Sequence, residues 1–229
     1  MTNKLFVPFR SPVRMPNGLQ WFDNELFVMD QLTDDIFVLD ETGKVKRIIR
    51  TETENGSGIT VGGGSVWTAC NGKANAHPPR PYDNHVSKVR KLDPCTGDTI
   101  DFFLTPDGGG IHGIEWDNGN IWLTAFNPKS LILVDGGTYD VLQKFPCDLT
   151  VLHGLARDDT GIWCADRAEK LIVKFDVSTG KELDRILLPK DGPDPHGLTI
   201  RNQQLWYSDA NFPITDGMRG YPEIGTIQR

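Results

Sequence analysis

The chain has 229 residues, of which 38% are hydrophobic and 24% charged, and this composition excludes wholesale disorder. Its formal net charge is −7 at pH 7 and no stretch concentrates Lys and Arg, which argues against a nucleic-acid partner. No run approaches the roughly 18 apolar residues of a membrane span, and the first residues, MTNKLFVPFRSPVR, show no signal-peptide pattern. We therefore expect a cytoplasmic protein whose four cysteines are free thiols.

A repeat organises the whole chain. Each copy reads x-Gly-[Ile/Leu], then six further residues, then an aliphatic residue followed by an aromatic one. The copies begin at Asn17, Ser57, His112, His153 and His196. Their aromatic residues are Phe27, Trp67, Trp122, Trp163 and Trp206. Agreement at four positions in all five copies indicates one structural unit used five times.

Each repeat predicts four short strands. The first two are joined by a tight turn, as in IHGIEW-DNGN-IWLTA at 111–125. The third ends in a turn that combines Asp with Thr, as in 176–180, and the fourth leads to the next copy. Four antiparallel strands per repeat, arranged radially, form the blade of a β-propeller. The aromatic residue would pack between neighbouring blades.

The two ends of the chain complete the last blade. After the fifth copy EIGTIQR (223–229) remains, and the missing outer strand is KLFVPFR (4–10) at the other end. The prediction is an all-β, five-bladed β-propeller of four-stranded antiparallel blades, closed by the N-terminal strand joining the C-terminal blade. It forms a single domain over 1–229, with a Pro- and His-rich insertion at about 71–86 that we expect to cover the channel mouth as a lid.

The residue before each repeat glycine is expected at the mouth of the central channel. These five residues, here called the mouth ring, are Asn17, Ser57, His112, His153 and His196. Three histidines at equivalent positions favour a functional site over structural turns. The second strand reaches the same face thirteen residues later, at Asp30, Cys70, Ala125, Asp166 and Asp209. We expect Asp166 and Asp209 to orient the imidazoles of their own blades or to join them on a metal.

Other side chains are candidates for substrate binding. Arg167 follows Asp166 and could pair with an anionic group of a substrate, the alternative being a surface ion pair. Glu115 either points into the channel or serves as a buried hydrogen-bond partner. His77 and His85 lie in the insertion. The full set of substrate-binding candidates is Asn17, Asp30, Ser57, Glu115, Arg167, His77 and His85.

Two chemistries fit the histidines. His112, His153 and His196 could hold a divalent metal ion through neutral imidazoles. Without a metal, crowded imidazoles suppress one another's protonation and leave a general base near neutral pH. The sequence has no G-x-S-x-G motif, phosphate-binding loop or dinucleotide fingerprint, so we expect no nucleotide cofactor.

The segments IHGIEWDNGNIWLTA (111–125) and PHGLTIRNQQLWYSDA (195–210) resemble the repeat of the virginiamycin B (streptogramin) lyase-like propellers. In that family a channel histidine acts as base near a divalent ion held partly by acidic residues. The resemblance implies such roles for His112, His153 and His196, with Asp166 and Asp209 as acidic neighbours. That lyase has seven blades, whereas this sequence predicts five and hence a narrower channel.

These features lead to one predicted function and two alternatives. The prediction is a small-molecule lyase or isomerase that uses the histidines for proton abstraction. Asn17 and Ser57 interrupt the histidine pattern, so the site does not repeat in every blade, which favours an enzyme over a non-catalytic propeller that binds a ligand or a protein. A metal-dependent lactonase or hydrolase would need Glu and Asn oxygens around a harder ion. We expect a small-molecule substrate and a monomer or small homo-oligomer.

Overall fold

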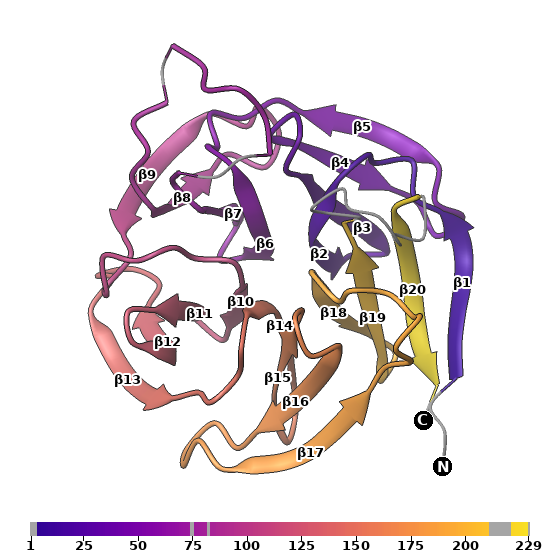
Figure 1. Ribbon diagram of the computed structural model, residues 1–229. Coiled ribbons are helices and arrows are strands. Elements are labelled where there is room, and N and C mark those ends of the chain that lie inside the picture. The colour runs from indigo at the N-terminus through magenta and orange to yellow at the C-terminus, as the bar shows by residue number, and fades with distance from the viewer. Residues whose placement is uncertain (1–3, 74–75, 82, 211–220, 229) are drawn as a thin grey trace.

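The fold is a ring of five four-stranded antiparallel sheets (Figure 1). The computed structural model describes residues 4–73, 76–81, 83–210 and 221–228. Each sheet is one propeller blade, and the sheets follow the chain in order around the ring. The predicted five-bladed β-propeller is confirmed. No helix in the described part of the chain is long and apolar enough to cross a membrane.

In each blade the four strands are ordered from the channel to the outside. Blade 1 comprises β2 (Pro16–Phe22), β3 (Glu25–Asp30), β4 (Asp35–Leu39) and β5 (Val45–Ile49). Blade 2 comprises β6 (Gly56–Gly62), β7 (Ser65–Cys70), β8 (Lys88–Leu92) and β9 (Thr99–Leu104). Blade 3 comprises β10 (Ile114–Asp117), β11 (Asn120–Phe126), β12 (Lys129–Asp135) and β13 (Val141–Pro146). Blade 4 comprises β14 (Leu152–Asp158), β15 (Gly161–Asp166), β16 (Leu171–Phe175) and β17 (Glu182–Leu187). Blade 5 comprises β18 (Leu198–Arg201), β19 (Gln204–Asp209), β20 (Glu223–Gln228) and β1 (Lys4–Arg10).

The N-terminal strand closes the ring as predicted. β1 pairs antiparallel with β20, from Lys4 opposite Gln228 to Arg10 opposite Glu223, with a bulge between Phe6 and Phe9. Both ends of the chain therefore lie beside each other in one blade (Figure 1). This pairing leaves β20 with a neighbour on each side, so it is not an open sheet edge.

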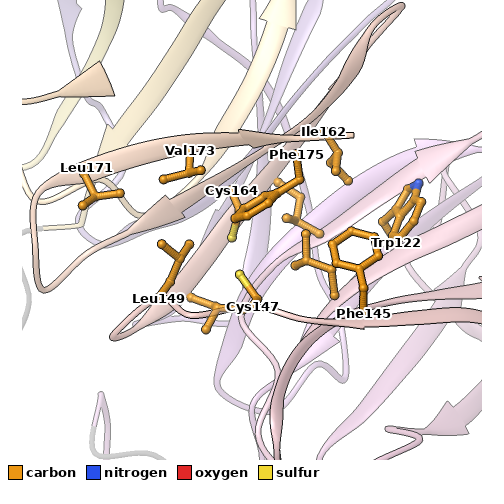
Figure 2. Packing of buried hydrophobic residues seen from close by; sticks show 12 residues of the cluster. Trp122, Phe145, Cys147, Leu149, Ile162, Cys164, Leu171, Val173 and Phe175 are labelled. Atoms are coloured by element: carbon orange, nitrogen blue, oxygen red, sulfur yellow. The ribbon is translucent and has the colours of Figure 1, made fainter. Parts of the chain in front are cut away.

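The repeated aromatic residue forms the layer between blades. Trp67 and Trp122 are 1% exposed, and Trp163 is 3% exposed. The Trp67 indole stacks on Trp116 of the next blade, with ring centroids 5.8 Å apart. Figure 2 shows one such layer, where Trp122 of blade 3 and Ile162 of blade 4 belong to the same apolar cluster. The predicted packing role of the aromatic repeat position is thus confirmed.

The repeat glycine is required by close packing of the inner strands. A Cβ atom on Gly58 would lie 2.5 Å from the His112 carbonyl oxygen. On Gly113 it would lie 2.1 Å from the corresponding oxygen of His153. Five inner strands around one axis approach so closely that four of the five glycines contact the mouth-ring residue of the following blade, and Gly18 contacts the backbone of Gly58. A side chain there would push the blades apart.

The aliphatic residue after each glycine closes the channel. These side chains belong to Leu19, Ile59, Ile114, Leu155 and Leu198. The space left between them is about 10 Å³, roughly the minimum that a single water molecule occupies. The mouth ring therefore lies above an apolar floor instead of an open pore.

Candidate functional site

The mouth ring brings three imidazoles into contact. The ring centroids of His112 and His153 are 4.1 Å apart, and those of His153 and His196 are 4.7 Å apart. His153 and His196 are only 3% and 1% exposed, whereas His112 is partly exposed. His153 thus lies between the other two, and His112 forms the accessible side of the cluster.

Burial keeps these imidazoles neutral. It lowers the pKa of His112 to about 4 and that of His196 to about 3. The pKa of His153 is also far below its ordinary value, first through burial and then through the charges that its two neighbours would carry. The positive charge of Arg167 lowers the pKa of all three histidines further. At neutral pH each histidine therefore has one nitrogen with a free lone pair.

A backbone carbonyl determines the tautomer of His196. Its Nδ1 lies 2.8 Å from the carbonyl oxygen of Asp194. A carbonyl oxygen can only accept, so Nδ1 carries the hydrogen and Nε2 carries the lone pair. The backbone N–H of Ala210 lies 3.3 Å from the same Nδ1. Because a protonated Nδ1 has no lone pair, it cannot accept a hydrogen bond from this N–H. Nε2 of His196 is therefore the basic nitrogen.

The two other mouth-ring residues have structural contacts. The side-chain amide of Asn17 donates to the Gln31 Oε1 atom at 2.6 Å. The Ser57 hydroxyl donates to the Ile111 carbonyl oxygen at 2.6 Å, which ties blade 2 to blade 3. Asn17 Oδ1 is buried and has no hydrogen-bond partner among the described residues. Asn17 thus keeps one acceptor available at the mouth.

The carboxylates at the ends of the second strands hold loops in place. Asp166 accepts hydrogen bonds from the backbone N–H groups of Thr150 at 2.6 Å and Val151 at 3.1 Å. Asp30 accepts from the backbone of Met15 in the same way, at 2.9 Å, and Asp209 from that of Asp194 at 3.2 Å. These hydrogen bonds account for the carboxylates as loop anchors, and their predicted action on the imidazoles remains a prediction.

The following position contacts the mouth ring in blades 1, 2, 3 and 5, and in blade 4 it acts on the ring through the charge of Arg167. The residues fourteen positions after the ring residue are Gln31, Asn71, Phe126, Arg167 and Ala210. Asn71 Nδ2 lies 3.5 Å from His112 Nε2, and the Phe126 ring meets the His112 imidazole edge-on at 5.1 Å. Sequence reasoning missed Gln31, Asn71 and Phe126, although the same repeat register contains them.

Glu115 is a buried acid between blades 3 and 4. It is 7% exposed, and burial raises its pKa to about 8, so it is protonated at neutral pH. Its Oε1 accepts from the backbone N–H of Arg157 at 3.1 Å, whereas Oε2 has no partner among the described residues. This contact fits the buried hydrogen-bonding role that the sequence left open beside a channel role.

The insertion is attached to blades 1 and 2 by acidic residues. His77 Nε2 lies 2.9 Å and the Arg80 guanidinium 2.7 Å from the buried carboxylate of Asp34. The Glu54 carboxylate accepts the backbone N–H of Asn84 at 3.0 Å and lies 3.3 Å from His85 Nδ1. Part of the insertion projects past the outer edge of the propeller (Figure 1). The described contacts of His77 and His85 thus anchor the insertion, and a lid function stays a prediction.

The described donor atoms are not arranged as a metal site. Within the described residues, no group of three or more His, Cys, Asp or Glu side chains is arranged to hold a metal ion. The imidazoles contact one another through their rings, and Nδ1 of both His112 and His153 is buried without a partner. We therefore derive no chemical step through a metal, and the divalent ion stays a prediction.

The fold and this cluster define the chain as a five-bladed β-propeller with neutral histidines above a closed channel. No protein-family model matches it. It is similar to NHL repeat-containing protein 3 of Mus musculus, with 24% identity over 203 residues, covering 77% of this chain and 56% of that protein. The chain therefore spans little more than half the length of this curated relative.

Two solved structures share the fold. Glutaminyl cyclase from Myxococcus xanthus aligns with a TM-score of 0.70 and 9% identity, over 98% of this chain and 94% of that one. Virginiamycin B lyase from Staphylococcus aureus aligns with a TM-score of 0.57 and 14% identity, over 96% of this chain and 68% of that one. The predicted resemblance to virginiamycin B lyase-like propellers is confirmed for the fold, which is all that such identities show.

Proposed function

We propose that the chain is a small-molecule lyase or isomerase in which a mouth-ring histidine acts as general base. One observation carries the proposal: three neutral imidazoles contact one another above a closed apolar floor. A neutral imidazole can take a proton from a carbon acid, and the electron pair left behind forms a new double bond. Loss of a leaving group from the adjacent carbon completes an elimination, whereas return of the proton to another carbon completes an isomerisation.

His153 and His196 are the candidate bases. The Asp194 carbonyl fixes the His196 tautomer with Nε2 as acceptor, and His153 lies between the two other imidazoles. A His-to-Ala variant of the Staphylococcus aureus virginiamycin B lyase, solved with quinupristin, is catalytically inactive, which supports the choice of a histidine as the base.

The proposal is tested by hydrogen exchange, which reports proton abstraction whatever product forms afterwards. The protein is incubated in D₂O with quinupristin and a panel of small hydroxy acids, sugar acids and cyclic esters, and NMR follows the loss of C–H signals. We expect exchange or conversion of at least one compound by the wild-type chain and none by His153→Ala or His196→Ala. Equal exchange by the wild type and both variants contradicts the proposal.

The alternative is a propeller that binds a ligand without transforming it. The low histidine pKa values favour it, because imidazoles with pKa values of about 3 and 4 are weak bases at neutral pH. Similarity to an NHL repeat-containing protein agrees with a non-catalytic role as well. Binding of a panel compound without exchange supports this alternative.

A further inference from the structure

Arg167 brings a positive charge to the mouth ring that no described carboxylate neutralises. Its backbone N–H donates to the Val151 carbonyl oxygen at 3.1 Å. Its side chain is partly exposed, but Nε is buried and has no hydrogen-bond partner among the described residues. Arg90 Nε is unpartnered as well, but the Arg90 guanidinium lies 3.5 Å from the Glu52 carboxylate. No such carboxylate among the described residues pairs with Arg167, so its guanidinium can take an acceptor from a bound group.

Other arginines with partly buried side chains are neutralised within the protein. Arg157 Nε lies 3.0 Å from the Asp117 carboxylate. Arg80 pairs with Asp34 at 2.7 Å. These two arginines thus have carboxylate partners within the chain, whereas Arg167 has none among the described residues.

Arg167 is held beside the histidines by the blade 4 sheet. Asp166, which precedes it, pairs with Leu152 across β14 and β15, and His153 directly follows Leu152. The charge of Arg167 acts on all three imidazoles. Further unpartnered buried atoms lie on the same ring, namely Nδ1 of His112 and of His153 and Oδ1 of Asn17. Four residues of blades 1, 3 and 4 thus leave buried polar atoms without partners among the described residues.

We propose that the mouth ring binds its small-molecule ligand through a carboxylate group held by Arg167. The inference rests on the proposed function, because it names the substrate class of the same site. The planar guanidinium matches a carboxylate with two parallel hydrogen bonds. The single charge of one guanidinium balances the single charge of a carboxylate better than the higher charge of a phosphate.

Such binding would also affect the base. Arg167 disfavours protonation of the neighbouring imidazoles, because two positive charges would lie close together. A bound carboxylate offsets that charge and makes the imidazoles more basic. The ligand would therefore increase the strength of the base that acts on it.

The test measures binding of three simple anions and needs no turnover. Acetate, succinate and inorganic phosphate are titrated at constant ionic strength against chloride, with thermal unfolding and the imidazole NMR signals as readouts. We expect both carboxylates to raise the melting temperature and to shift the imidazole signals of the wild-type protein. Arg167→Gln should bind them at least tenfold more weakly. Arg185→Gln, which removes an exposed arginine paired with Glu182, should bind them like the wild type.

Each outcome decides the inference. It is overturned if the wild type does not respond to carboxylates, if Arg167→Gln responds equally, or if phosphate binds as tightly as acetate and succinate. If Arg167→Gln does not fold, the NMR shifts of the wild-type imidazoles still locate the anion. Carboxylate binding without D₂O exchange would leave the inference standing while the lyase proposal fails. D₂O exchange without carboxylate binding would support the lyase proposal and overturn the inference.

Discussion

The two faces of the propeller differ in the groups that they present. The mouth ring has unpartnered polar atoms, whereas the opposite face has a pocket of about 710 Å³ between blades 4 and 5. Arg157 and Asp158 line that pocket, but Arg157 pairs with Asp117 at 3.0 Å and Asp158 with Lys174 at 2.6 Å. Two charged residues of the large pocket therefore have ion-pair partners, whereas the mouth ring keeps buried polar atoms without partners among the described residues. The proposed function therefore rests on the unpaired groups and not on the larger volume.

The repeat explains why the large pocket exists. Four residues after the mouth-ring residue, blades 1 and 3 have Trp21 and Trp116, which pack against the aromatic layer of the preceding blade. Blade 5 has Ile200 at the same position, and Ile200 lines the pocket beside Trp163. A smaller side chain leaves the gap unfilled. The pocket is thus a packing difference between blades.

The largest effect on turnover is expected when a base is removed from the mouth ring. His153→Ala or His196→Ala should lower turnover about 10²–10⁴-fold, the usual contribution of a positioned general base. Stability should change little by comparison, since the aromatic layer between blades is untouched. The measurement is the exchange rate in D₂O together with the unfolding midpoint. Variants with normal turnover would leave the binding alternative.

The opposite pattern is expected for the pocket wall. Trp163→Ala should lower the free energy of unfolding by about 3–5 kcal/mol, as large core truncations do, because Trp163 is 3% exposed. Its folded fraction should retain the exchange activity. Denaturant unfolding and activity per folded molecule measure the two effects. A loss of activity in the folded fraction would mean that the faces are coupled.

The pH dependence of stability should separate the histidines from Glu115. The folded pKa values of His112 and His196, about 4 and about 3, lie below the ordinary 6.5. Between those values the unfolded chain binds more protons, so stability is lost as pH falls from 6.5 toward 4, by at most about 1.4 kcal/mol per pH unit for each histidine. Urea unfolding across this range should show a shallower loss in His112→Asn than in the wild type. An unchanged pH profile would contradict the lowered pKa of His112.

Glu115 should act with the opposite sign. Its folded pKa of about 8 exceeds the ordinary 4.5, so the folded state binds more protons between these values and stability falls as pH rises through them. Glu115→Gln keeps the shape without the ionisation and should remove that decline. Urea unfolding at pH 5 and pH 8 tests it: the variant should gain stability relative to the wild type at the higher pH. An identical difference at both pH values would contradict the raised pKa.

The smallest expected effect comes from filling the pocket. Ile200→Trp restores the residue found in blades 1 and 3 and should raise the free energy of unfolding by about 1 kcal/mol, as cavity-filling changes commonly do. Exchange activity should be unchanged. Loss of activity with a gain in stability would show that the pocket, and not the mouth ring, holds the substrate.

The sequence predicted the propeller because one physical requirement recurs in each copy. Inner strands that approach one another need a glycine, as Gly58 and Gly113 show, and the layer between blades needs a large aromatic such as Trp122. Both requirements are visible without coordinates. The meeting of the three histidines followed from the same register, because equivalent residues of a closed repeat face one axis.

The sequence did not show which residue of the second strand contacts that axis. In blade 1 Pro16 pairs with Asp30 and Gly18 with Met29, so Asn17 is an extra residue at a bulge. Blade 4 has the same irregularity after Leu152. A bulge changes the side to which the alternating residues point. Counting along the strand therefore selected Asp30 and Asp166. Gln31, the residue after Asp30, contacts Asn17, and Arg167, the residue after Asp166, acts on the histidines through its charge.

The closed channel limits the route by which a ligand can reach the mouth ring. The aliphatic side chains, among them Leu19 and Leu155, block the axis beneath the histidines, and a propeller that is blocked there has no through-passage. A ligand of the mouth ring therefore enters and leaves on the same face of the propeller.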